Sequence, residues 1–127
     1  MKKQYYFESG SSALLFSLLS EKEKSQTIFL PEFICNNLVE RLKNNKIQID
    51  YYKIKNDLTT DWIDLKKKIK KYQKEVIYIL YVNYFGKIND RKKFIDIKSN
   101  FKNNNVIKLV EDNSHGHYLN IKKNLIS

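Results

Sequence analysis

The stretch "EVIYILYVNYFG", residues 75–86, decides the fold class of this chain. It is the longest apolar run in the sequence, and it is too rich in β-branched and aromatic residues to favour a helix. Because apolar residues fill it without the alternation of a half-exposed strand, it predicts a central strand that is buried on both faces. Gly86 bounds the run at its carboxyl end.

Helical and strand patterns alternate along the chain on both sides of this run. Strands are predicted at 27–31, 46–54 and 106–110, and the last of these is also read as buried. Helices are predicted at 9–20, at 36–43, from a cap at Asp61 to residue 74, and from a cap at Asn89 or Asp90 to about residue 101. This order predicts one α/β domain over residues 1–127, with a mostly parallel, doubly wound sheet and helices on both faces.

Two helices carry patterns that indicate which side faces the core. The first has an apolar face made of Leu14, Leu15, Leu18 and Leu19. In the third, Trp62, Leu65, Ile69 and Tyr72 recur at spacings of a helical turn, and the lysines of "KKKIKKYQK" are predicted to lie mostly on the opposite, solvated face.

The composition is that of a globular protein, with 42% hydrophobic and 30% charged residues. No apolar stretch approaches the roughly 18 residues that a membrane span needs. The start "MKKQYYFESGSSALLFSLL" resembles a signal peptide, but Glu8 interrupts it and no cleavage site follows, so it is read as mature sequence. The single Cys35 excludes an internal disulfide and favours the reducing cytoplasm.

The net charge of +10 raises the alternative of a basic α/β module that binds nucleic acid through lysine-rich helices. Only Arg41 and Arg91 are arginines, and a surplus of lysine at tolerant surface positions is typical of an AT-rich coding sequence. Nucleic acid is therefore kept as the second hypothesis.

Polar residues that could bind a ligand or take part in catalysis lie in two segments. "SGSSAL", residues 9–14, places glycine and hydroxyls at a helix start, where free N–H groups favour an anion. "VEDNSHGHY", residues 110–118, follows a strand end, which is where open α/β sheets hold ligands. The simpler interpretation is that Asp112 caps a turn and that His115 and His117 are exposed loop residues. A metal site at Asp112, His115 and His117 is not predicted, because an H-x-H pair needs further ligands.

Four motifs in order, "SGSSAL", "FLPEFIC", "VNYFG" and "VEDNSHG", resemble the N-terminal part of the DegT/DnrJ/StrS-type sugar aminotransferases. These are pyridoxal-phosphate enzymes of the aspartate-aminotransferase fold. The resemblance implies that Ser11 and the amide of Ser12 hold the cofactor phosphate. It also implies that Asp112 faces the pyridine nitrogen, with Glu111 pointing to the other side, and that His115 lies near the phenolic oxygen. Phe33, or Cys35 in the same segment, would lie against the ring.

The same resemblance sets limits on activity. The family's Schiff-base lysine follows in an S-x-x-K motif well downstream of the aspartate, and neither Lys122 nor Lys123 matches it. The chain is therefore expected to be an N-terminal cofactor-binding segment, truncated before that lysine and inactive alone. A nucleotide-sugar substrate, an amino donor, polysaccharide synthesis and a homodimer are what the resemblance implies for a complete enzyme.

Overall fold

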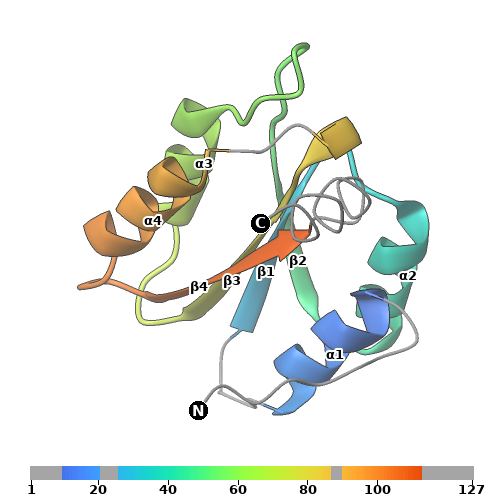
Figure 1. Cartoon of the computed structure of the whole chain (residues 1–127). Coiled ribbons are helices and arrows are strands. Elements are labelled where there is room, and N and C mark those ends of the chain that lie inside the picture. The colour runs from blue at the N-terminus through green and yellow to red at the C-terminus, as the bar shows by residue number, and fades with distance from the viewer. Residues whose placement is uncertain (1–9, 21–25, 87–89, 113–127) are drawn as a thin grey trace, which may run out of the picture.

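The computed structural model describes residues 10–20, 26–86 and 90–112, and all structural statements below concern these residues. They form four helices, four strands and a short 3-10 helix, and Figure 1 shows how these elements are arranged. In chain order these are α1 (Gly10–Ser20), β1 (Gln26–Pro31), α2 (Asn36–Asn44), β2 (Gln48–Tyr52), α3 (Trp62–Ile69), β3 (Val76–Val82), η1 (Tyr84–Gly86), α4 (Arg91–Asn100) and β4 (Val106–Asp112).

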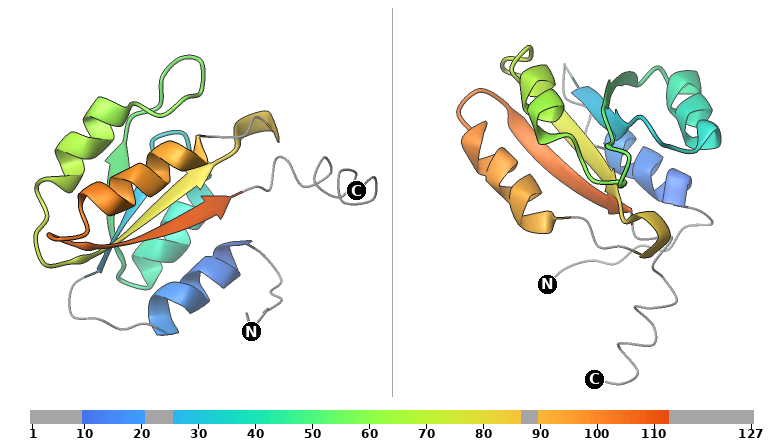
Figure 2. Two further views of the ribbon diagram at one scale, coloured as in Figure 1. Left: turned by 60° about the vertical axis from the view of Figure 1, so that its left-hand side comes forward. Right: turned by 90° about the horizontal axis from the view of Figure 1, so that it is seen from above.

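The four strands form one sheet in the order β2-β1-β3-β4, and every neighbouring pair is parallel. Helices α1 and α2 cover one face, and α3 and α4 cover the other (Figures 1 and 2). The predicted α/β architecture, a parallel sheet between two helical layers, is thus confirmed.

The burial of β3 explains why its sequence is apolar throughout. All seven of its residues are buried. Tyr78 and Leu80 pack into the core under α1 and α2, whereas Ile77 and Ile79 pack into the core under α3 and α4. A strand between two helical layers needs apolar side chains at both odd and even positions, because these face opposite sides of the sheet. The prediction of a central strand is confirmed.

Aspartates begin two of the helices. The side chain of Asp61 accepts a hydrogen bond from the N–H of Asp64 at 3.1 Å, and that of Asp90 accepts one from the N–H of Lys93 at 3.2 Å. Of the two candidate caps of α4, Asp90 is therefore the one used. Each carboxylate satisfies an N–H that has no partner within its helix.

Several predicted boundaries are wrong. Helix α3 ends at Ile69 rather than at 74, and Lys74 beyond it has a left-handed φ of 55°. Strand β2 begins at Gln48 rather than at 46, because Lys46 has a φ of 59°, which is incompatible with a strand. In α1, Leu19 is 41% exposed, although it was predicted to lie on the buried face.

The fourth strand also differs from its prediction. It continues through Glu111 to Asp112, so both carboxylates belong to the strand itself. It is mostly half-buried rather than buried, because it lies at an edge of the sheet. Among the described helices, none has the length and apolar character that crossing a bilayer requires.

Candidate functional site

The sheet has a topological switch point between β1 and β3. From β1 the chain continues through α2 to β2 on one side, and from β3 it continues through α4 to β4 on the other. The connection after β1 crosses one face of the sheet and the connection after β3 crosses the other. The two connections therefore diverge at the carboxyl ends of these strands. In open α/β sheets ligands bind in the crevice at this point.

Tyr84, just after β3, contacts Phe33 and is influenced by the charge of Asp112. Its hydroxyl donates a hydrogen bond to the backbone carbonyl of Phe33, and the two rings lie 5.3 Å apart. Burial raises the pKa of Tyr84, and the nearby charge of Asp112 raises it further. Phe33 follows β1 and Asp112 ends β4, so Tyr84 links three strand ends.

The two candidates for the ring-stacking residue have different surroundings. The Phe33 side chain is 54% exposed while its ring lies beside Tyr84. Cys35 is exposed and stands at the N-cap position of α2, without a side-chain capping bond. Of the two, Phe33 is the one that offers an exposed ring beside Tyr84.

The remaining predicted residues lie partly outside the described part of the chain. Ser11 and Ser12 are in the first turn of α1, but their side chains are not described. Figures 1 and 2 show that α1 runs opposite to the strands, so this turn lies toward the carboxyl end of the sheet. His115 and His117 lie outside the described residues.

Glu111 points to the side of the sheet opposite to Asp112, where it gathers polar groups that were not predicted. One of its oxygens, Oε1, accepts from the amide of Asn83 at 2.8 Å and from Nε of Arg91 at 2.8 Å. Asn83 is fully buried. The bond to Glu111 raises the pKa of Arg91, and burial, with Glu111 beside it, raises that of Tyr81.

This cluster could have been found in part from the sequence. The "VNYFG" segment marks a strand end, where polar residues have positional meaning, but nothing in it shows that Asn83 pairs with a residue 28 positions later. Phe85 in the same segment is 73% exposed with a left-handed φ of 51°. A bulky residue in this conformation is strained, and such strain is frequent at functional sites.

A concave feature lies away from the switch point, between α3 and α4. It is an open groove of about 310 Å³, lined by Trp62, Lys66, Lys93, Asp96, Ile97 and Asn100. The ammonium of Lys93 lies 5.5 Å from the centre of the Trp62 ring, whose edge-on neighbour at 4.7 Å is Phe94. The groove therefore combines one aromatic ring with two lysines.

Comparison with known proteins gives no family assignment: no family model matches the chain, and no curated protein matches its sequence. The described residues also contain no group of three histidines, cysteines or carboxylates that could hold a metal ion. What the fold defines is a parallel α/β protein whose candidate ligand site is the topological switch point at the carboxyl ends of β1 and β3.

Proposed function

We propose that this chain is the N-terminal cofactor-binding segment of a pyridoxal-phosphate-dependent nucleotide-sugar aminotransferase, and that the switch point between β1 and β3 binds the cofactor. The observation that supports it is the position of Tyr84. Phe33 and Asp112 are far apart in sequence, yet the hydroxyl of this buried tyrosine donates to the Phe33 carbonyl and the charge of Asp112 raises its pKa.

The described residues fit the parts of pyridoxal 5'-phosphate. The exposed ring of Phe33 is a stacking surface, since aromatic pairs favour offset or tilted contact. Asp112 supplies a carboxylate that can accept a hydrogen bond from a protonated pyridine nitrogen. The first turn of α1, which contains Ser11 and Ser12, supplies backbone N–H groups that a helix leaves without internal partners and that can bind the phosphate.

When bound, the cofactor withdraws electrons from a substrate carbanion into its ring. The chain's own residues bind and orient: Phe33 fixes the ring plane, Asp112 keeps the pyridine nitrogen protonated, and Tyr84 holds Phe33 by its backbone. No described lysine is assigned as a Schiff base, so the proposal concerns binding rather than transamination. The sugar substrate, the amino donor, the dimer and the cytoplasmic setting rest on the resemblance and on the single cysteine.

The test uses pyridoxine 5'-phosphate, which cannot form imines with the many lysines of the surface. Binding to the wild type is compared by calorimetry with binding to Asp112→Ala and Ser11→Ala. Asp96→Ala, which removes an exposed carboxylate from α4, is the matched control. We expect both site variants to bind about tenfold more weakly, because each loses a charge-assisted or helix-terminal contact. Equal binding by all four proteins would reject the proposal.

A second function is favoured by one observation, the groove between α3 and α4. A basic groove with an aromatic side chain is a common way to hold single-stranded nucleic acid. Trp62 packs against the core on the apolar side of its helix, as expected, and it also lines this groove with Lys66 and Lys93. Because Trp62 is the only tryptophan, its fluorescence reports directly on the groove.

The nucleic-acid function predicts quenching of Trp62 fluorescence by a short oligothymidylate. The affinity should fall steeply as salt rises from about 50 to 200 mM, because lysine contacts release counterions. Lys66→Gln and Lys93→Gln should weaken binding, whereas Lys43→Gln on α2 should not. An unchanged spectrum at low salt would remove this function.

A further inference from the structure

The two edges of the sheet differ in how their backbone groups are satisfied. At the β2 edge, the carbonyl of Tyr52 accepts from the N–H of Glu32 beyond β1, so Tyr52 faces the sheet. Backbone groups alternate in direction along a strand, and those of Tyr51 and Lys53 therefore point outward. An outward row of such groups is a template for another strand unless something covers it.

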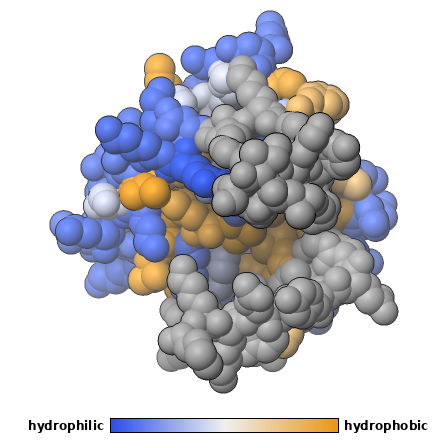
Figure 3. Space-filling model, viewed as in Figure 1, coloured by the Kyte–Doolittle hydropathy of each residue, from blue (hydrophilic) through white to orange (hydrophobic). Residues whose placement is uncertain are grey.

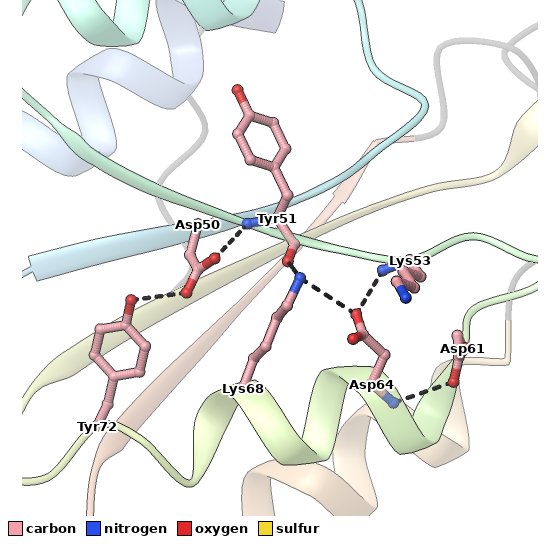
Figure 4. A network of polar contacts seen from close by, with 7 residues as sticks. All are labelled: Asp50, Tyr51, Lys53, Asp61, Asp64, Lys68 and Tyr72. Carbon is pink, nitrogen blue, oxygen red and sulfur yellow. Dashed lines mark hydrogen bonds and ion pairs between the residues drawn. The ribbon is translucent and has the colours of Figure 1, made fainter.

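Side chains cover the outward groups of β2, as Figure 4 shows. The N–H of Tyr51 donates to Oδ1 of Asp50 at 2.8 Å, and the ammonium of Lys68 donates to the Tyr51 carbonyl. The N–H of Lys53 donates to Oδ2 of Asp64 at 2.8 Å. Asp64 and Lys68, 3.4 Å apart on α3, thus take the place of a neighbouring strand's acceptor and donor.

The β4 edge has no such cover within the part of the chain that the structure describes. The N–H of Val106 donates to Glu75 and the carbonyl of Asp112 accepts from Asn83, each at 3.0 Å, so even-numbered residues of β4 face β3. By the same alternation, the backbone groups of Ile107, Leu109 and Glu111 point outward. No described strand pairs with them.

The side chains along this edge are apolar and accessible. Val106 is 54% exposed, and Leu109 and Val110 are half-exposed. Figure 3, which views the molecule from the β4 side, shows an orange apolar band across the middle of this face. The band contrasts with the β2 edge, where aspartates and a lysine make the closing contacts.

We propose that β4 pairs with β4 of a second copy of this chain, antiparallel across a two-fold axis at Val110. In this register Leu109 lies opposite Glu111 of the second copy, and their outward backbone groups exchange hydrogen bonds on both sides of the axis. Val110 lies opposite Val110 of the second copy. Lys108 of each copy lies directly opposite Asp112 of the other, so the axis generates two such pairs.

The charges of β4 select this register. An axis at Leu109 would place Lys108 opposite Val110, and an axis at Lys108 would place two lysines opposite each other. The axis at Val110 alone puts opposite charges at non-hydrogen-bonded positions, where the side chains approach most closely. The strand is therefore self-complementary in charge as well as in backbone groups.

The net charge of +10 on each chain opposes association at long range. Salt screens this repulsion beyond about 8 Å at 150 mM, whereas the contacts along β4 are shorter than that. Measurements at this ionic strength therefore report on the strand pairing rather than on overall repulsion.

The test is a charge exchange followed by sedimentation velocity over a concentration series up to about 100 µM. Lys108→Glu places carboxylates opposite each other, and Asp112→Lys does the same with lysines, so each should raise the dimer dissociation constant at least tenfold. The double variant Lys108→Glu/Asp112→Lys restores both pairs and should dimerise within about threefold of the wild type. Circular dichroism confirms that each variant is folded.

Three results would overturn the proposal: a monomeric wild type across the series, unaffected single variants, or a folded double variant that stays monomeric. Hydrogen exchange tests whether a segment of the same chain, rather than a second copy, covers the edge. If the amide of Leu109 is protected in a monomer, a segment of the same chain covers the edge and the second copy does not. Because no arm uses a cofactor, failure here leaves the proposed function standing.

Discussion

The hydroxyl of Tyr84 should support both the stability of the fold and the binding of pyridoxine 5'-phosphate. Replacing Tyr84 by Phe removes the donor to the Phe33 carbonyl and leaves the ring in place. A neutral hydrogen bond of this kind contributes about 0.5–1.5 kcal/mol to the free energy of unfolding. A loss of about 1 kcal/mol at the position that fixes Phe33 corresponds to roughly fivefold weaker binding.

Tyr52 provides a matched control. Its hydroxyl also donates to a backbone carbonyl, that of Leu80, at 2.7 Å, and its side chain is fully buried. It packs under α3 and α4 rather than beside Phe33. Tyr52→Phe should therefore lower the free energy of unfolding by a similar amount, about 1 kcal/mol, but leave analogue binding unchanged.

Urea unfolding gives the stability of both variants, and calorimetry at a temperature where all are folded gives the binding. We expect both variants to lose stability and only Tyr84→Phe to lose affinity for the analogue. If Tyr84→Phe binds the analogue as tightly as the wild type, Tyr84 does not organise the site. If Tyr52→Phe weakens binding equally, the effect is one of general stability.

Three further predictions concern single side chains. Asp90→Ala should lower the free energy of unfolding by about 1 kcal/mol in urea, since it removes the cap of α4, while exposed Asp96→Ala should change it by less than about 0.5 kcal/mol. Burial, and then the hydrogen bond to Asp50, raise the pKa of Tyr72 from 10.0 to about 12. The native state thus keeps this proton longer, so stability that is full below pH 10 declines between pH 10 and 12, and Tyr72→Phe should flatten that decline. Phe85→Gly should raise the free energy of unfolding by up to about 1 kcal/mol by relieving the left-handed φ of 51°, and a destabilised variant would refute the strain.

The sequence was sufficient for the order and type of the elements, because the burial of β3 on both faces and the apolar spacing of α3 are local patterns. It was less reliable at their ends. The strand predicted to begin at 46 begins at Gln48, because Lys46 adopts a left-handed conformation that propensity does not foresee. Lys68 was placed on a solvated face, yet its ammonium reaches the Tyr51 carbonyl at the sheet edge.

The candidate site was predictable only where a motif named it. Phe33, Tyr84 and Asp112 all lie in motif segments, but nothing in "VNYFG" shows that the Tyr84 hydroxyl bonds to the Phe33 carbonyl. The bond between Asn83 and Glu111 likewise depends on the register of β3 with β4, which pairs Val82 with Asp112. A register of this kind follows from the packing of the whole sheet and cannot be predicted from the sequence of either strand alone.

The position at which pyridoxine 5'-phosphate binds tests the proposed cofactor site. Amide chemical shifts of the ¹⁵N-labelled chain would be followed while the analogue is added. We expect the largest changes at Phe33, Tyr84, Asp112 and the first turn of α1, and we expect Asp112→Ala to reduce them. Changes confined to Trp62, Lys66 and Lys93, or no changes at all, would contradict the proposed site.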